Sequence, residues 1–342
     1  MVTRADVAKK AGVSVSAVSR TINRNGYVAK AKKEAILDAI AELGYRQNPI
    51  SQSLKSGSSH QICFYKADLY NPYYMDLYNY MSQYADELGY TLFLINSLHA
   101  DKFNTLLLDG MIIGNEIAAR DFNREIKCNI GFPIVSNSYG TPLIENKGIS
   151  YVDMDAYEAV SKGIEYLIKK GHHKIAFATP YRKMSGELLQ ARTIAYENAM
   201  QPFLGEKISE YEFVSSLSFD DYFNHNEFFY EEGIQAADMF IKNRNDATAI
   251  LCFNDIFAMG MMSRLQSCGL KIPEDISIMG IDGISSRKYM KPLLTSVDMK
   301  MQQHAKVCID ILMELISGKR TSCFVHLKPG IVEGESVRRC CN

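Results

Sequence analysis

The sequence predicts an N-terminal all-α helix-turn-helix headpiece with a hinge helix, followed by an α/β body of two doubly wound parallel-sheet subdomains. Three observations predict this fold class. Short helical segments with local start or stop signals follow one another in the first 58 residues, and the net charge changes sign after them. From residue 61, apolar strands alternate with amphipathic helices, and the alternation restarts after residue 153. Such alternation is typical of parallel sheets joined by crossover helices.

The first two helices are predicted from their end signals. Thr3 followed by Asp6 resembles a capping box, so a helix is expected to begin just after Thr3. Gly12 tolerates a positive φ and is expected to end this helix. Ser14 then caps a second helix that runs to about Asn23. Two short helices around a tight turn form a helix-turn-helix.

Helical spacing assigns two faces to the second helix. Val18 and Ile22 lie one turn apart and are expected to face inward, which places Ser16 and Arg20 on the opposite face. An arginine can read a guanine edge through two hydrogen bonds, and Val15 at the helix start can contact a thymine methyl. The alternative is a helical hairpin with a merely solvated polar face.

The next segment predicts a third helix and then a short hinge helix. Residues 31–43 carry one apolar stripe that covers the first two helices, and Gly44 stops it. Pro49 follows the candidate N-cap Asn48 and starts a helix with only two large apolar residues, one of them Leu54. A helix this short is unstable alone in water, so we expect it to fold on binding.

Charge supports a nucleic-acid partner at one end of the chain. Residues 1–58 hold ten Lys and Arg against four Asp and Glu, a net charge of +6. Because the whole chain carries −1, residues 59–342 carry −7. The near-neutral pI of about 6.7 hides this division. A basic headpiece on an acidic body fits DNA binding through the headpiece alone.

Composition narrows the class further. A chain of 342 residues with 47% hydrophobic content can bury large cores in two or three domains. The sequence begins with no signal peptide and contains no long apolar run, so we expect a cytoplasmic protein without a membrane partner. Its eight cysteines lack metal-binding spacing, so free thiols and no cofactor are expected.

The body is expected to consist of two similar halves with a cleft between them. Strands are expected at 61–65, 91–96, 109–113, 133–136, 174–178, 211–215, 249–253 and 276–280. Helices are expected at 73–88, 156–169, 188–201, 231–242 and 255–266. The twelve residues between 96 and 109 leave room for only a short crossover helix.

Ligands of open parallel sheets bind beyond the carboxyl ends of the strands. Polar and aromatic residues that follow, or lie near, these ends form the candidate effector site: Asp68, Asn71, Tyr73, Tyr74, Arg192, Asn254 and Asp282. An arginine with Asp and Asn groups and aromatic walls suits a polyhydroxylated ligand, because each hydroxyl needs a directional partner. The alternative is that these residues only cap helices and turns.

The sequence resembles the lactose repressor/galactose repressor (LacI/GalR) family of bacterial transcription regulators. The matching motifs include Asp-Val-Ala-x-x-Ala-Gly-Val-Ser-x-x-x-Val-Ser-Arg at 6–20, Asn48-Pro with Leu54, and Asn254-Asp255. The resemblance implies that helix 15–23 enters the major groove and that Leu54 wedges between base steps in the minor groove. The candidate DNA contacts are Ser14, Val15, Ser16, Arg20, Asn23, Asn48, Ser51, Leu54 and Lys55.

The resemblance extends over nearly the whole chain and implies a body like the periplasmic sugar-binding proteins. The expected domains are 1–47, a hinge at 48–58, and a body of two subdomains, about 59–152 with 299–320 and about 153–298 with 321–342. In the family, the matching positions contact effector sugars or purines. We expect a homodimer that binds double-stranded operator DNA, with an interface on helix 255–266 and strand 276–280.

The function expected from this reasoning is a repressor of a carbohydrate-utilisation operon, controlled by a sugar or sugar phosphate. An enzyme is disfavoured, because the sequence contains no phosphate loop, no Gly-x-Ser-x-Gly, no metal cluster and no plausible triad. Two alternatives remain: a regulator controlled by a protein partner, with a vestigial pocket, and a sugar-binding protein without regulation. The headpiece disfavours the second.

Overall fold

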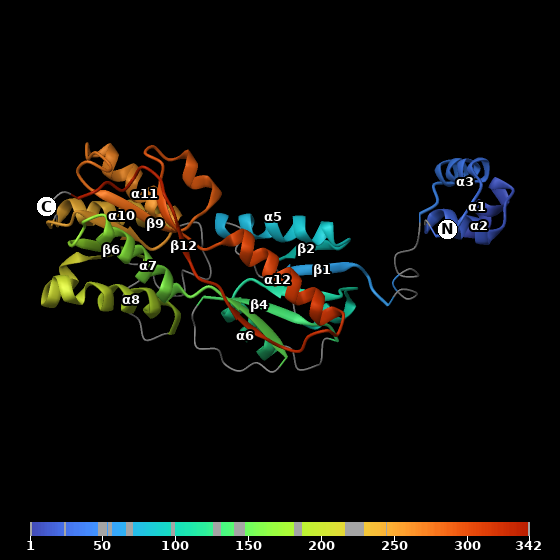
Figure 1. The fold of residues 1–342 in the computed structure, drawn as a ribbon, viewed down its shortest axis with the longest axis horizontal. Helices are drawn as coiled ribbons and strands as arrows, with labels where there is room; N and C mark the ends of the chain where they lie inside the picture. The colour runs from blue at the N-terminus through green and yellow to red at the C-terminus, as the bar shows by residue number, and fades with distance from the viewer. Residues whose placement is uncertain are drawn as a thin grey trace. The chain divides into compact units, whose positions relative to one another are not determined.

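The computed structural model divides into two compact units, Met1–Ser59 and His60–Asn342 (Figure 1). The structure describes residues 2–23, 25–46, 53, 57–65, 71–96, 100–125, 131–139, 148–180, 187–215, 229–243 and 245–340. Each unit has its own core.

The first unit is a three-helix domain of α1 (Arg4–Ala11), α2 (Val15–Ile22) and α3 (Lys30–Leu43). Val18 is fully buried between the three helices, together with side chains from α1 and α3. The capping box at Thr3 is present with both of its hydrogen bonds, which confirms the predicted start of α1. The predicted helix-turn-helix is therefore confirmed.

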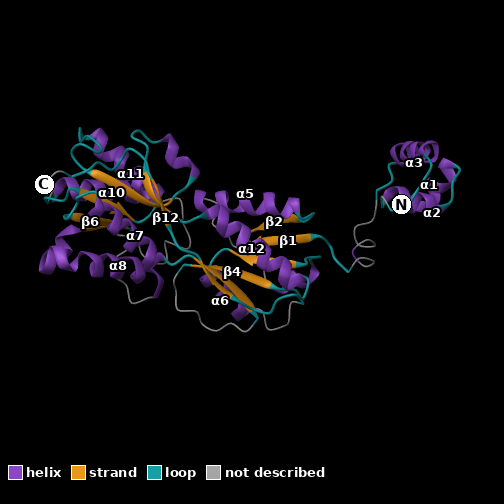
Figure 2. Cartoon of the chain, in the orientation of Figure 1, coloured by secondary structure: helices purple, strands orange, loops and turns teal. Residues whose placement is uncertain are grey.

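The second unit contains two six-stranded sheets, each flanked by helices (Figure 2). The first sheet has the order β11-β5-β4-β3-β1-β2, with all strands parallel. Its strands are β1 (Gln61–Tyr65), β2 (Thr91–Ile95), β3 (Gly110–Ile113), β4 (Ile134–Ser138), β5 (Ile149–Asp153) and β11 (Phe324–His326). Its helices are α5 (Pro72–Glu87), η1 (Ala100–Thr105), α6 (Glu116–Glu125) and α12 (Met301–Ile316). We call this the first lobe.

Alternation along β1 assigns the two faces of this sheet. Ile62 and Phe64 pack in the core that includes α5 and α12, whereas Cys63 and Tyr65 pack in the core that includes α6. All four side chains are fully buried, as a parallel sheet covered on both faces requires. The described part of the connection after β2 forms the 3₁₀ helix η1, which agrees with the predicted short crossover helix.

The second lobe is built on a sheet of order β12-β10-β9-β8-β6-β7, parallel except for β12. Its strands are β6 (Ile175–Thr179), β7 (Glu212–Val214), β8 (Ala249–Cys252), β9 (Ser277–Asp282), β10 (Thr295–Asp298) and β12 (Gly330–Val332). Its helices are α7 (Ala156–Lys169), α8 (Glu187–Leu204), η2 (Gly205–Tyr211), α10 (Phe229–Lys242), α11 (Asp255–Ser267) and η4 (Ser285–Tyr289).

One predicted subdomain limit needs correction. The segment 321–342 was expected in the second subdomain, but β11 pairs with β5 in the first lobe, through Phe324 opposite Tyr151. The chain therefore crosses between the lobes after β5, after β10 and after β11. The last crossing comes only after His326, because the parallel pairing with β5 keeps the chain in the first sheet until that residue. The other predicted domain limits stay predictions.

Two glycines bring α10 and α11 into close backbone contact. A Cβ on Gly233 would lie 2.0 Å from the Phe257 carbonyl oxygen, and a Cβ on Gly260 would lie 1.9 Å from that of Tyr230. Much of α11 is therefore covered within the same chain. The strand β9 lies between β8 and β10, and all six of its residues are buried. The dimer interface predicted on strand 276–280 is wrong for that reason.

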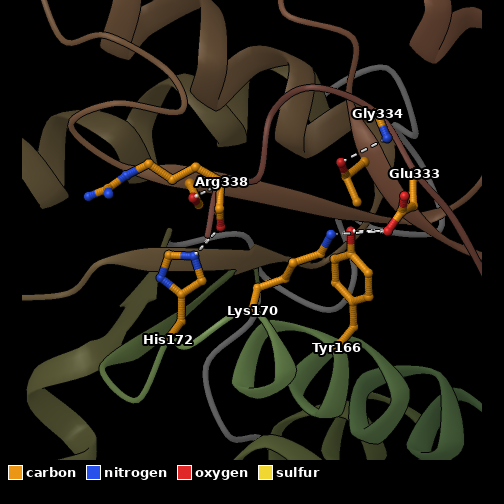
Figure 3. A network of polar contacts seen from close by, with 8 residues as sticks. Tyr166, Lys170, His172, Glu333, Gly334 and Arg338 are labelled. Atoms are coloured by element: carbon orange, nitrogen blue, oxygen red, sulfur yellow. Dashed lines mark hydrogen bonds and ion pairs between the residues drawn. The ribbon is translucent and has the colours of Figure 1, made fainter. Parts of the chain in front are cut away.

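The C-terminal segment that includes Glu333 and Arg338 is bound to the second lobe by a network of hydrogen bonds (Figure 3). His172 lies between Thr248, 2.9 Å from its Nδ1, and the Arg338 carbonyl oxygen, 3.0 Å from its Nε2. Glu333 accepts hydrogen bonds from Tyr166 and Lys170 of α7 and its C-terminal end. Burial lowers the pKa of His172, which favours the neutral ring in this position.

Among the described residues, no helix is long and apolar enough to cross a membrane.

Candidate nucleic-acid interface and effector site

The outer face of α2 presents the five described residues that the sequence proposed as DNA contacts. Ser14 caps the helix by accepting a hydrogen bond from the Ala17 amide at 3.2 Å, while its own side chain remains exposed. The other four exposed side chains are Val15, Ser16, Arg20 and Asn23. Val15 keeps 48% of its surface exposed, so its side chain is accessible to a partner.

The opposite face of α2 holds the helix in the domain. Val18 is fully buried and Ile22 packs half-buried beside it, so the predicted orientation is confirmed. Arg4 of α1 donates to the Ser19 hydroxyl and to the Tyr45 hydroxyl, each at 3.3 Å. These bonds tie α1 to α2 and to the segment that follows α3, so the exposed face is presented on a rigid support.

Additional positive charge lies at the start of α3. Lys30, Lys32 and Lys33 are exposed in its first turn, and Ala29 provides no side-chain cap. Cations at a helix N-terminus oppose the helix dipole and weaken the helix start. A phosphate backbone beside these lysines would compensate that charge.

Some predicted site residues lie outside the described residues. They are the proposed hinge contacts Asn48, Ser51, Leu54 and Lys55, and the proposed effector contact Asp68.

In the body, Arg192 and Phe253 form one side of the candidate effector site. Arg192 lies early in α8, and its guanidinium stacks on the Phe253 ring at 4.2 Å from the ring centroid. The same guanidinium donates to the Phe253 carbonyl oxygen. These contacts hold the charge at the carboxyl end of β8 while Arg192 remains half-buried. A fixed arginine can offer its remaining N–H groups to a ligand hydroxyl, phosphate or carboxylate.

Asp282 is the last residue of β9, the strand next to β8. It therefore lies at the same carboxyl edge of the sheet as Phe253, which follows β8. It is buried, and its φ of 119° is outside the usual range for a residue with a side chain. Burial raises the pKa of Asp282 to about 7, and the positive charge of Arg192 acts in the opposite direction. Desolvated carboxyl groups with strongly shifted pKa values are typical of binding sites, and also occur in structural networks.

The first lobe contributes an aromatic group at the N-terminal end of α5. The rings of Tyr73 and Tyr74 meet edge to face at 5.4 Å, and Tyr139 contacts both. The Tyr73 hydroxyl lies 3.4 Å from Nδ1 of His304. Burial raises the pKa of Tyr73 and lowers that of His304 to about 4, so both groups are neutral at physiological pH. The charges of Asp282 and Arg192 also act on Tyr73, which brings both lobes into one electrostatic environment.

Two other predicted site residues serve as helix caps. Asn71 accepts a hydrogen bond from the Tyr73 amide at 3.0 Å, and Asn254 accepts one from the Phe257 amide at 2.8 Å. The capping alternative therefore holds for their acceptor oxygens. Their side-chain amide groups can still donate to a ligand.

Asp255 is a component that sequence reasoning missed. It is fully buried, and its two oxygens accept from the Ser296 hydroxyl at 2.5 Å and from the Ile284 amide at 2.9 Å. Burial and the nearby charge of Asp282 raise the pKa of Asp255 well above its usual range. The Asn254-Asp255 motif marked this position, but no local pattern showed that the partners of Asp255 are Ser296 and Ile284. Phe253, Tyr139 and His304 were missed as well, because each acts through a partner distant in sequence.

The described residues contain no group of three or more His, Cys, Asp or Glu placed to hold a metal ion. The arrangement is instead one of hydrogen-bond donors and acceptors with aromatic surfaces. It can bind a small polar molecule through an arginine, a buried carboxyl group and tyrosines.

Comparisons with known proteins extend these observations. Residues 3–48 match the family described as bacterial regulatory proteins, lacI family, and residues 164–337 match a periplasmic binding protein-like domain. The chain is 30% identical to the HTH-type transcriptional repressor PurR of Vibrio atlanticus (strain LGP32), over 99% of each chain. It is 28% identical to the PurR repressor of Vibrio vulnificus (strain CMCP6), over 99% of each chain.

Solved structures share the fold. A structure of the Lac repressor bound to ONPG superimposes with a TM-score of 0.75 at 20% identity, and covers 98% of this chain and 99% of its own. A LacI family regulator from Enterococcus faecium with bound ribose gives a TM-score of 0.67 at 20% identity, over 82% of this chain and 100% of its own.

Proposed function

This chain belongs to the LacI family of bacterial regulatory proteins, and we propose that it is a repressor whose operator affinity is switched by a small molecule bound between its two lobes. It is a DNA-binding regulator and not an enzyme, as its relatives are transcriptional repressors. The carbohydrate operon, the sugar effector, the homodimer and the cytoplasmic location are the proposed parts.

DNA recognition is assigned to the exposed face of α2. The observation that carries the proposal is the contrast between its faces: Val18 is buried, while Arg20 and Val15 face solvent on a helix fixed by Arg4. In the major groove, Arg20 would read a guanine and Val15 a thymine methyl. Lys33 would contact phosphate and contribute affinity without specificity.

The effector is proposed to bind Arg192 and Asp282 of the second lobe and the tyrosines of α5 in the first. A sugar or sugar phosphate fits this set, because Arg192 and Asp282 together provide donors and an acceptor for hydroxyl groups. A structure with bound ribose shares the fold, which supports the sugar. The second candidate is a purine, supported by the PurR relatives, by the Phe253 ring beside Arg192 and by the paired rings of Tyr73 and Tyr74.

A homodimer is proposed because one small headpiece buries too little surface for tight specific binding. The edge strand β2 provides a candidate surface in the first lobe. Phe93 on β2 keeps 43% of its surface exposed, and Leu88, at the end of α5, keeps 51%. The family resemblance supports this surface, because the helix that matches α5 contributes to dimer packing in the family.

A selection followed by a ligand screen tests this function. The full-length chain selects duplexes from a random pool, and a near-palindromic sequence is expected to be enriched. A thermal-shift screen then compares sugars, sugar phosphates, nucleobases and nucleosides. The compound that raises the melting temperature is expected to change affinity for the selected duplex, and Arg192→Ala is expected to abolish that change while leaving ligand-free DNA binding intact.

Each other outcome has a defined meaning. No enriched duplex would rule out the regulator itself. An enriched duplex with no stabilising compound would favour control by a protein partner and a vestigial pocket. A normal response in Arg192→Ala would mean that the effector site has been assigned to the wrong residues.

A further inference from the structure

The loop that follows Asp282 is held by both lobes. Three consecutive backbone amides each donate to a different side chain. Gly283 donates to the Ser296 hydroxyl at 3.0 Å, and Ile284 donates to Asp255 at 2.9 Å. Both acceptors belong to the second lobe. The third amide, of Ser285, donates to Asp76 of the first lobe at 2.7 Å.

The contact with Asp76 has two bonds. The Ser285 hydroxyl donates to the second carboxylate oxygen of Asp76 at 2.9 Å, in addition to the amide bond. Ser285 is the first residue of η4, and Ile284 before it provides no side-chain cap. Asp76 therefore caps η4 from the other lobe. A carboxylate at this position both satisfies free amides and complements the helix dipole.

The three anchors differ in how firmly they are fixed. Asp255 is fully buried and is held by Ser296, so its bond to Ile284 moves with the second lobe. Asp76 is half-buried on α5, and Ser285 is exposed. The two hydrogen bonds between Asp76 and Ser285 are therefore the contact of this loop that a change in the angle between the lobes would strain. Asp282 is only three residues from Ser285, so the carboxyl group of the proposed effector site and the amide that Asp76 holds lie on one short loop.

We propose that Asp76 is a positioning residue of the effector site, which acts through Ser285 to couple the loop at Asp282 to the angle between the lobes. This inference rests on the proposed function, because it concerns the switch of the same regulator. Asp76 needs no contact with the effector. It selects the lobe arrangement in which the loop 283–285 is capped, and effector binding at Asp282 shifts that equilibrium.

Hydrogen exchange and DNA binding test the coupling in the full-length chain. The variants are Asp76→Ala, Ser285→Ala, the double variant, and the control Asp86→Ala, an exposed acid on the same helix. The DNA probe is the duplex selected by the wild-type chain, with a random duplex beside it. Asp76→Ala is expected to speed exchange in the peptide 283–290 about tenfold, as loss of a charge-assisted hydrogen bond allows.

The same variant is expected to change the Kd for the selected duplex at least fivefold, with the melting temperature and the random-duplex affinity unchanged. A cap with only a local structural role would not move operator affinity. Ser285→Ala keeps the amide bond and should show a smaller change. The double variant should differ little from Asp76→Ala, because the two side chains share one interaction. Asp86→Ala should match the wild type.

Operator affinity within twofold of the wild type in Asp76→Ala would overturn the proposal, whatever its exchange rate. If Asp76→Ala does not fold, Ser285→Ala decides alone, because its exposed hydroxyl can be removed without disturbing the core. Operator affinity equal to that of the wild type in Ser285→Ala would then overturn the proposal. If the wild type selects no duplex, the proposed function fails instead. In that case, an unchanged exchange rate at 283–290 in Asp76→Ala would independently overturn the proposed coupling between Asp76 and Ser285.

Discussion

The headpiece and the body place their polar residues under opposite conditions. On α2, Ser16 and Arg20 are exposed, and only the helix beneath them is held in place. In the body, Asp282 and Asp255 are buried, and Arg192 is fixed against Phe253. The exposed face of α2 therefore loses its water only when DNA binds. In the body, folding has already removed water from the polar groups of the proposed site. Substitutions of the exposed residues of α2 should therefore cost DNA affinity, whereas substitutions at buried positions of the body should cost stability.

The largest effect is expected where backbone meets backbone in the body. Gly260→Ala places a Cβ 1.9 Å from the Tyr230 carbonyl oxygen. The gain in helix propensity is about 1 kcal/mol. Overpacking costs about 1–3 kcal/mol or more, and here the obstacle is backbone that cannot rotate away. Denaturant unfolding should therefore show a net loss of stability in the body, with the headpiece transition unchanged.

A matched control is Gly163→Ala in α7. Its Cβ would meet only side-chain tips, with Leu251 and Val297 at 3.1 Å. That variant should lie closer to the wild type. Equal losses of stability for both variants would show that the backbone contact between α10 and α11 is not the reason why Gly260 cannot be replaced.

The next effect should appear in DNA binding alone. Arg20→Ala removes an exposed side chain that supports nothing in the core, so the melting temperature should stay unchanged. Affinity for the selected duplex should fall by about 1–3 kcal/mol, or about 5- to 150-fold, with relaxed preference at one base pair. Fluorescence anisotropy on the selected and random duplexes measures this. Lys33→Ala is the control and should weaken both duplexes alike. Equal losses on both duplexes for Arg20→Ala would remove the base-reading role.

This contrast also explains which parts were predictable from the sequence. The headpiece signals are local: Thr3, Gly12 and Ser14 end or begin helices within a few residues of themselves. The strand Gln61–Tyr65 and the helix 156–169 were predicted with the bounds that the structure has, because apolar runs and helical periodicity are also local. Burial confirmed the orientation of α2, while contact with DNA stays a prediction.

The effector site depends on pairings that no local pattern carries. Tyr73 meets His304 across 231 positions, and Asp76 meets Ser285 across 209. The return of β11 to the first sheet could not be predicted either, because a short edge strand has weak alternation and its partner is chosen by topology. Helix α12 (Met301–Ile316) also lay outside the expected elements, because its N-cap residue, Lys300, provides no capping side chain and so gives no local start signal.

A smaller effect is expected at the first helix cap. Thr3→Ala removes the side-chain acceptor for the Asp6 amide and disrupts the capping box. The expected loss is about 1 kcal/mol of headpiece stability. Local exchange in α1 should rise, while the thermal transition of the body remains unchanged. A shift of the body transition would show that the two units do not unfold independently, and would weaken the contrast between them.

The smallest effect is a pH dependence at the crossovers between the lobes. His326 lies 2.9 Å from Asp153 through Nδ1 and 3.1 Å from Glu158 through Nε2. These hydrogen bonds, that of Asp153 first, raise the pKa of His326 above 6.5. A raised pKa means that the folded chain holds a proton that the unfolded chain releases. The stabilisation is therefore complete below pH 6.5 and is lost as the pH rises through the folded pKa.

Unfolding of the wild type and of His326→Gln across pH 6–9 isolates this contribution as their difference. Because the ring is partly exposed, the difference should stay below about 1 kcal/mol and shrink toward high pH. His172 and His304 act in the opposite sense, since burial lowers their pKa values and their stabilisation is lost on acidification. They are present in both proteins and cancel in the difference. A difference that grows with pH would mean that His326 is not held in its protonated form between the two carboxylates.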